Sequence, residues 1–170
     1  MGSLRWTSSN AVFITEIDDE HRVIFEAVSS LQKALTNPGQ LADIPTKMQH
    51  LVASIVGHFA HEERLMRAAR YRSLRWHKRA HDAAHKRVGQ YALQVGQGDT
   101  KAGLELVEYL TSWLHDHTGL ADRMMGAFLR NQQRCMCKVT FQAGTKPLDA
   151  CAWVAARGEA FSPRSSNGNS

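Results

Sequence analysis

The sequence is poor in the residues that interrupt or cross-link a chain. Its 170 residues include only three cysteines and four prolines. Three cysteines are too few, and odd in number, for a mini-domain stabilised by disulfides. Four prolines and 12 glycines are too few for a collagen-like or proline-rich protein. No apolar run is long enough to cross a bilayer. With 43% hydrophobic and 22% charged residues, the chain has the composition of about one globular domain.

The beginning of the sequence also lacks targeting signals. Residues 1–6 contain no apolar segment of the kind found in secretory signals. Trp6 occupies the position where a myristoylation motif requires Ser or Thr. We therefore expect a cytoplasmic protein without membrane insertion, either a monomer or a small homo-oligomer.

Apolar residues recur at helical spacing in four stretches, which run over residues 24–35, 48–66, 74–95 and 104–128. Turn-forming segments separate them, such as Asn37-Pro-Gly39. Four amphipathic segments joined by short loops predict an all-α protein, specifically an antiparallel up-down-up-down four-helix bundle over residues 1–130.

Residues 131–170 differ in character and are predicted to form a C-terminal extension. We expect a short strand at Lys138–Phe141, a short helix at Asp149–Arg157 and a disordered end that is too polar to fold. The three cysteines lie here, and we interpret them as free thiols, with a metal or redox role as the alternative: Cys135, Cys137 and Cys151.

Six polar side chains fall on helical faces that should be apolar: His21, His58, Glu62, His77, His81 and His117. Burying such groups without partners costs roughly 1–3 kcal/mol each, and six would consume most of a net stability of roughly 5–15 kcal/mol. A single buried histidine is ordinarily a hydrogen-bonded core residue, but here every helix contributes one and two pairs are spaced i,i+4. Imidazole and carboxylate are natural metal ligands, so the sequence predicts a metal site inside the bundle.

The segments around these residues resemble the hemerythrin family, in particular its single-domain bacterial members, the bacteriohemerythrins. The resemblance runs from about Trp6 to Phe128. Four segments carry it: Ile17-Asp-Asp-Glu-His21, His58-Phe-Ala-His-Glu-Glu63, Tyr71 with His77-x3-His81, and Trp113-Leu-His-Asp-His117-x4-Asp122.

The resemblance implies two iron ions per chain. One would be held by His77, His81 and His117, and the other by His21 and His58. Two carboxylates, Glu62 and Asp122, would bridge them together with an oxo or hydroxo group. The iron with two histidines would keep an open position for dioxygen. The implied function is reversible dioxygen binding for storage, for sensing or for delivery to an oxygen-consuming enzyme, and not catalysis.

The spacing of Asp122 is unusual for a ligand that follows His117. Five residues rotate a side chain by about 140° around a regular helix, so we expect a helix distortion near Gly119. The resemblance also places an oxygen pocket at Trp113, Leu114 and Thr118. Thr118 departs from the isoleucine usual in the family, and we predict that its hydroxyl, by hydrogen bonding to bound oxygen or admitting water, accelerates autoxidation.

Two other functions remain open at this stage. One is a di-iron enzyme that reduces peroxide or nitric oxide, and the other is an iron buffer. Ferritin-like oxidases use Glu-x-x-His repeats and more carboxylates, whereas this sequence has no Glu-x-x-His and offers five histidines to two carboxylates. That ligand set favours carrying oxygen over activating it.

Four further histidines are left outside the ligand set: His50, His61, His85 and His115. His85, four residues after His81, is the nearest competitor as a ligand. Nine Lys or Arg residues lie between Arg64 and Arg87. They have few aromatic residues among them, so we interpret them as a solvated face and expect no nucleic-acid binding.

Overall fold

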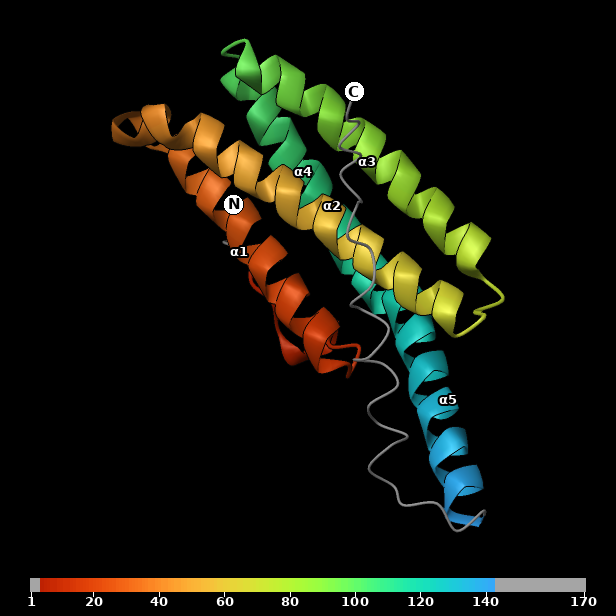
Figure 1. Ribbon diagram of the computed structural model, residues 1–170. Helices are drawn as coiled ribbons and strands as arrows, with labels where there is room; N and C mark the ends of the chain where they lie inside the picture. Colours follow the sequence, from red (N-terminus) through yellow and green to blue (C-terminus); the bar gives the residue numbers. More distant parts are fainter. Residues whose placement is uncertain (1–3, 143–170) are drawn as a thin grey trace, which may run out of the picture. The chain divides into compact units, whose positions relative to one another are not determined.

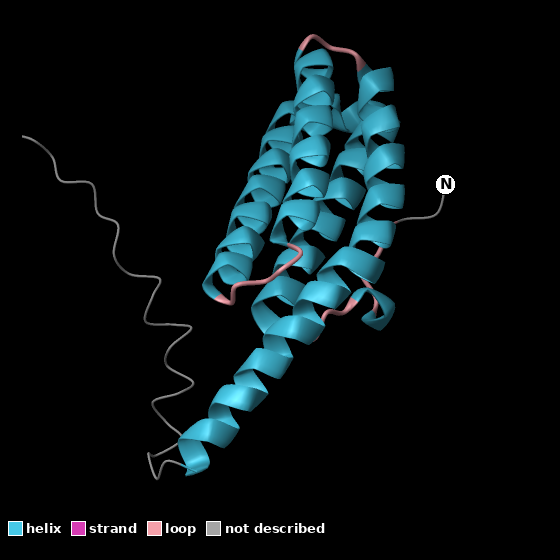
Figure 2. Ribbon diagram, turned by 90° about the vertical axis from the view of Figure 1, so that its right-hand side faces the viewer, coloured by secondary structure: helices cyan, strands magenta, loops and turns pink. Residues whose placement is uncertain are grey.

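The computed structural model describes residues 4–142, with side chains up to residue 134, and it confirms an antiparallel four-helix bundle (Figures 1 and 2). Four helices form the bundle: α1 (Thr15–Thr36), α2 (Ile44–Ala68), α3 (Leu74–Gly96) and α4 (Thr100–His117). A π-helical segment (Thr118–Asp122) then leads directly into α5 (Arg123–Gln142). Two short 3₁₀ segments, Ser8–Asn10 and Pro38–Asp43, precede α1 and α2. None of the described helices is long and apolar enough to cross a membrane.

The helices form a ring in which each packs against two neighbours. α1 contacts α2 and α4, and α3 contacts the same two helices from the other side. The inward faces bury a large apolar core, with Phe25, Leu51 and Leu110 among its largest members, and a second, smaller cluster that includes Met66 and Met125. Such burial contributes roughly 25 cal/mol for each Å² of apolar surface removed from water. The chain divides into two compact units, residues 1–129 and 130–170, and the bundle belongs to the first.

The helix ends follow local sequence signals. Pro45 lies in the first turn of α2, where a missing backbone N–H costs nothing. The Asp99 side chain caps α4 by accepting from the Ala102 amide at 3.0 Å. The Asp18 carboxylate in the first turn of α1 accepts from the amides of Val12 and Phe13 at 2.8 and 3.0 Å, and so holds the incoming segment against the bundle.

Two details of the sequence-based prediction are wrong. The apolar stretch predicted over residues 104–128 begins at Leu104, but this residue is exposed and Leu106 is buried instead. The strand expected at residues 138–141 is helical, because α5 continues to Gln142. A lone strand needs a partner for its backbone hydrogen bonds, whereas a helix satisfies them within the segment. The helix expected at Asp149–Arg157 and the disordered end lie outside the described residues.

The end of α2 has an unusual backbone. Arg70 adopts a left-handed conformation, with φ +54°, and the next amide, that of Tyr71, bonds back to the Met66 carbonyl at 2.9 Å. This is the helix-ending arrangement in which glycine is the usual residue. Gly98, with φ +91°, fills the same position at the end of α3. Arg70 therefore bears a conformational cost that Gly98 does not.

We predict that Arg70→Gly stabilises the protein. Glycine adopts the left-handed region without steric cost, so the free energy of unfolding should rise by about 1 kcal/mol. Urea denaturation of the two proteins measures the difference. The reverse change, Gly98→Ala, should lower stability by a similar amount and serves as the control. No gain for Arg70→Gly would mean that its side chain stabilises the turn in another way.

Candidate metal centre

All seven residues predicted as metal ligands meet inside the bundle. α1 supplies His21, α2 supplies His58 and Glu62, α3 supplies His77 and His81, and α4 with the π segment supplies His117 and Asp122. Each is less than 9% exposed. Their potential ligand atoms form two groups, each within 4.8 Å: Glu62, His77, His81, His117 and Asp122 in one, and His21, His58, Glu62 and Asp122 in the other.

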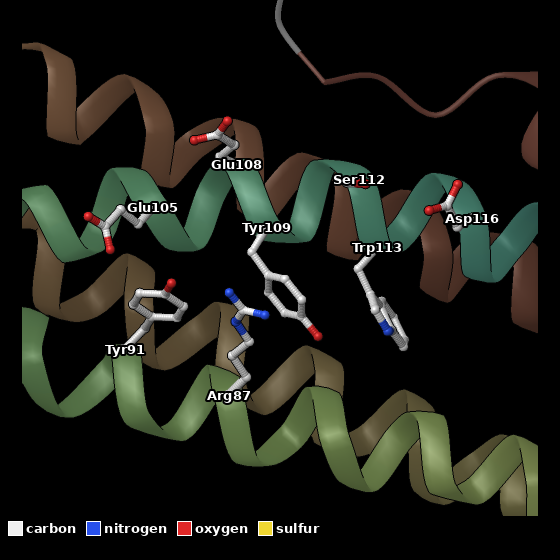
Figure 3. A pocket seen from close by; sticks show the side chains of 8 residues that line it. All are labelled: Arg87, Tyr91, Glu105, Glu108, Tyr109, Ser112, Trp113 and Asp116. Atoms are coloured by element: carbon white, nitrogen blue, oxygen red, sulfur yellow. The ribbon is translucent and has the colours of Figure 1, made fainter.

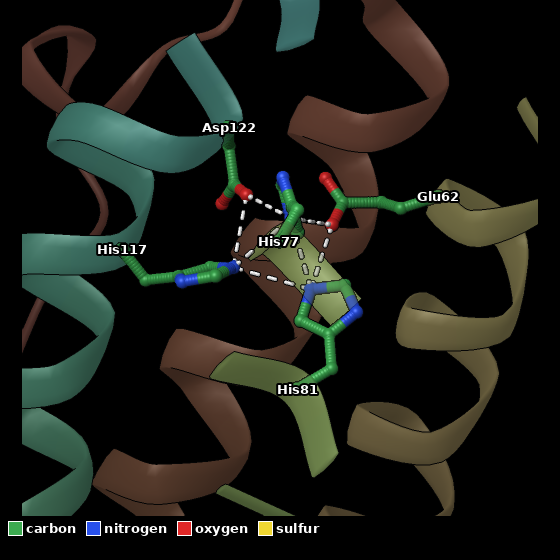
Figure 4. Close-up of side chains that lie close together, drawn as sticks. All are labelled: Glu62, His77, His81, His117 and Asp122. Atoms are coloured by element: carbon green, nitrogen blue, oxygen red, sulfur yellow. Dashed lines mark hydrogen bonds and ion pairs between the residues drawn. The ribbon is translucent and has the colours of Figure 1, made fainter. Parts of the chain in front are cut away.

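The larger group is built around three imidazoles (Figure 4). The Nε2 atoms of His77, His81 and His117 form a triangle with sides of 3.0, 3.1 and 3.2 Å. A Glu62 oxygen lies 3.3 and 3.2 Å from the first two, and an Asp122 oxygen lies 3.2 Å from His77 and 3.1 Å from His117. Five ligand atoms thus converge on one point.

The smaller group shares the same two carboxylates. The Nε2 atoms of His21 and His58 are 3.1 Å apart. The second Asp122 oxygen is 3.2 Å from His21, and a Glu62 oxygen is 3.7 Å from His58. Glu62 and Asp122 therefore face both groups, which is the arrangement that two bridged metal ions require.

The donor set fits metal ions better than it fits a network of hydrogen bonds. Three mutually adjacent imidazole nitrogens cannot all be paired by protons, because each bond needs one donor and one acceptor. Both Glu62 oxygens and both Asp122 oxygens are buried with no hydrogen-bond partner among the described residues. Nitrogen atoms about 3 Å apart are expected of ligands that share an ion through bonds of about 2.1 Å.

The expected helix distortion is present and brings Asp122 into the site. The π segment Thr118–Asp122 adds residues to the turn that follows His117. In a wider π turn, a residue five positions on lies on the same side of the helix. Asp122 is fully buried beside His117 as a result. Single-turn π segments of this kind are frequent at functional sites.

The cluster is strongly polarised in the absence of a cation. Burial and the neighbouring Asp122 oppose ionisation of Glu62, but His58, His77 and His81 outweigh them and lower its pKa to about 2. Burial likewise opposes protonation of His77, yet Asp122 and Glu62 raise its pKa to about 9. The two carboxylates therefore remain anionic and attract either a proton or a metal ion.

Sequence reasoning missed a carboxylate outside the ligand set. The Glu20 oxygens lie 3.0 Å from Nδ1 of His58 and 2.6 Å from Nδ1 of His61. Burial opposes ionisation of Glu20, but hydrogen bonds and charge from these histidines lower its pKa to about 2. A carboxylate on the outer nitrogen fixes the orientation of a ligating histidine. The sequence did contain a signal for Glu20, because this residue directly precedes the predicted ligand His21.

A second carboxylate lies beyond His81. A Glu63 oxygen is 3.6 Å from Nδ1 of His81, and Glu63 also pairs with Arg67 at 2.6 Å and Lys78 at 3.4 Å. His85, the competing ligand candidate, is exposed and belongs to neither group among the described residues.

The three residues expected in the oxygen pocket border the site. Leu114 and Thr118 are buried, and the Trp113 ring stacks on His117 with centroids 4.2 Å apart. One prediction about Thr118 needs correction, because its hydroxyl already has partners. It donates to the Leu114 carbonyl at 2.8 Å and accepts from the Asn10 amide at 3.2 Å. Its proton is thus engaged within the protein instead of being free for bound oxygen.

Trp113 also lines a surface cleft of about 520 Å³ between α3 and α4 (Figure 3). The Arg87 guanidinium lies 4.3 Å from the centre of the Tyr109 ring in this cleft. Three carboxylates also line the cleft: Glu105, Glu108 and Asp116. Trp113 therefore separates the imidazole of His117 from a water-accessible surface.

These features define the class of the protein: an α-helical bundle with a buried histidine–carboxylate centre for two metal ions. Comparison with known proteins agrees. The family described as "Hemerythrin HHE cation binding domain" matches residues 12–129. The chain is 35% identical over 117 residues to a bacteriohemerythrin of Stenotrophomonas maltophilia, an alignment that covers 69% of this chain and 75% of that protein.

More distant relatives share the same segment. Myohemerythrin-1 of Phascolopsis gouldii is 28% identical over 69% of this chain and 87% of its own length. The bacteriohemerythrin of Methylococcus capsulatus is 26% identical over 76% of this chain and 98% of its own length. The chain belongs to the hemerythrin family, whose members are non-haem iron, oxygen-binding proteins and not enzymes.

Metal uptake by the metal-free protein should release protons. Because the pKa of His77 is about 9, a proton occupies this imidazole at neutral pH and must leave before the nitrogen can bind a metal. Affinity for zinc, a redox-inert probe, should therefore increase as the pH rises toward 9 and level off above it. A pH indicator in weakly buffered solution should record release of at least one proton per chain at pH 7, because, despite burial, Glu62 and Glu20 raise the pKa of the second ligand His58 as well. Uptake without proton release would show that His77 is neutral.

Glu20→Ala should weaken metal binding. Without the carboxylate, the imidazole of His58 is free to rotate, and loss of such a partner typically lowers metal affinity about 10- to 100-fold. Competition with a chromophoric chelator measures the affinity. Glu26→Ala, which removes an exposed carboxylate from the same helix, is the matched control and should have no effect. Equal affinities for the two variants would exclude a role for Glu20 in orienting His58.

Proposed function

We propose that this chain binds dioxygen reversibly at a di-iron centre. Seven residues would hold the two ions: His21, His58, Glu62, His77, His81, His117 and Asp122. The observation that supports the proposal most directly is the sharing of Glu62 and Asp122 between two ligand groups. When bound, the iron pair supplies the electrons that dioxygen takes up on binding and returns on release.

The unequal ligand groups support reversible binding. One group offers three imidazoles and the other only two, although both share the same carboxylates. The position with fewer ligands is where a small molecule would be accommodated. Five histidines to two carboxylates leave the site with little anionic charge, and this favours release of oxygen over its further reduction.

The surrounding residues suit a carrier because they keep water out. Leu114 is 2% exposed and Thr118, which directly follows His117, is 1% exposed. Trp113 covers the imidazole of His117 on the side of the surface cleft. Exclusion of water suppresses the proton-dependent loss of reduced oxygen species. We infer that Trp113, Leu114 and Thr118 form the oxygen pocket.

The proposal is tested by metal analysis and by absorption spectroscopy of the reduced protein before and after oxygen is admitted. We expect about two irons per chain and a visible absorption band that appears with oxygen and disappears under vacuum over repeated cycles. A band that forms once and never reverts, with turnover of peroxide or nitric oxide, would favour the enzyme. Ready loss of iron to weak chelators would favour an iron buffer. If the protein proves to be an oxygen carrier, the next test is delivery of oxygen to an oxygen-consuming enzyme.

The pocket assignment has its own test. Thr118→Ile removes the hydroxyl and fills the space beside His117 and Asp122 with an apolar group. We expect slower autoxidation of the oxygenated protein, measured as decay of the same visible band. Asn10→Ala, which removes only the amide that donates to Thr118, separates loss of this hydrogen bond from the change in pocket polarity. An unchanged rate for Thr118→Ile would remove Thr118 from the pocket.

A further inference from the structure

Figure 1 shows the turn that connects α2 and α3. This turn lies in a segment rich in arginine, which the metal centre does not explain. Residues 64–81 contain six arginines and one lysine but no Asp or Glu. The arginines are all exposed: Arg64, Arg67, Arg70, Arg72, Arg75 and Arg79. We call this group the arginine tip. Trp76 lies among them and is 48% exposed.

Most of the arginine tip has no internal electrostatic partner. Arg67 pairs with Glu63, but no ion pair among the described residues involves the other five arginines. The single lysine of the segment, Lys78, is already engaged with Asp82 and Glu63. Five guanidinium groups are therefore available to an external anion.

Three of these six arginines lie at positions that disfavour folding, whereas Arg67 in the last turn of α2 suits the helix dipole. Arg75 lies in the first turn of α3, where the positive end of the helix dipole favours an acidic residue, and that turn has none. Arg75 and Arg79 are four residues apart on one helix, where like charges repel. Arg70 occupies the left-handed position in which glycine would be unstrained. Three separate departures from stable local structure in one turn indicate that the charge serves binding.

The composition of the tip distinguishes between kinds of anionic partner. Arginine and tryptophan are enriched in protein–protein interfaces and in their energetically dominant positions, whereas lysine is depleted there. The guanidinium fork matches a carboxylate with two hydrogen bonds. A membrane-bound surface would combine its basic residues with several apolar ones that insert into the lipid, and a nucleic-acid groove would offer several stacking aromatics. The tip offers Trp76 alone.

We propose that the arginine tip is a docking surface for an acidic protein, with Trp76 as its apolar contact. The partner presents carboxylates to Arg64, Arg70, Arg72, Arg75 and Arg79 beside an apolar or aromatic side chain. The inference is independent of the proposed oxygen chemistry, since it rests on surface charge. Docking at this turn places the partner at the start of α3, the helix that supplies His77 and His81.

The test measures binding of a fluorescent glutamate–tyrosine copolymer, as a carboxylate-rich polypeptide with aromatic side chains, to the full chain at about 0.15 M salt. Replacing Arg72, Arg75 and Arg79 by Gln should weaken binding about tenfold. The matched control replaces Lys33, Lys86 and Lys101, three exposed lysines elsewhere, and removes the same charge. It should change affinity less than about twofold.

Two single variants make the result independent of folding. Arg70→Gly relieves backbone strain, so weaker binding by this variant cannot come from a less stable protein. Trp76→Ser should weaken binding of the copolymer more than binding of polyglutamate, because only the copolymer offers aromatic side chains. Metal content and helical circular dichroism are measured for every variant.

Three results would overturn the proposal. The lysine control could lose as much affinity as the arginine variant, which would show attraction by net charge alone. Duplex DNA, at equal charge, could displace the copolymer from the same arginines, which would assign the tip to nucleic acid. Vesicles of phosphatidylglycerol and phosphatidylcholine could displace the copolymer from these arginines, which would assign the arginine tip to an anionic membrane.

Discussion

The loss of water around buried ligand atoms is the constraint on which the rest of this bundle depends. Five imidazoles and two carboxylates converge at its centre with separations of 3.0–3.7 Å. Each would be stabilised by water in the unfolded chain, and several lack any hydrogen-bond partner in the folded one. The surrounding apolar core must supply enough free energy to hold them together, and bound cations would convert that cost into stabilisation.

The fold meets this constraint by drawing ligands from every helix of the bundle. The i,i+4 spacing brings His58 and Glu62, and likewise His77 and His81, to one face of their helices. The fourth helix cannot do the same with a five-residue spacing, and its π segment resolves the mismatch. The Asn10–Thr118 hydrogen bond and a bond from Arg123 to the Ser9 carbonyl attach the N-terminal segment to that distorted turn. A local break in helical geometry is therefore held by tertiary contacts.

Much of this could be predicted from the sequence because it depends on periodicity. Apolar spacing indicated four helices, and polar residues on the same faces indicated the metal centre. The distortion beside Gly119 could be anticipated only because the resemblance to hemerythrins made Asp122 a ligand, and its spacing from His117 does not fit a regular helix. Periodicity could not predict contacts between residues that lie far apart in the sequence. Glu20 meets His58 across two helices, and the Thr118 hydroxyl is occupied by Asn10, a residue more than one hundred positions away.

The sequence also misled where local patterns compete. Val139 and Thr140 favour a strand, but helix-forming residues precede them and the described residues contain no partner strand, so the helix continues. The arginines of residues 64–79 first indicated an ordinary solvated face. Our proposal of a docking surface differs from that interpretation because Arg75 opposes the dipole of α3 and no acidic residue alternates with these arginines. Departures from local stability occur at the metal centre and at this turn, as expected where function instead of folding determines the residues present.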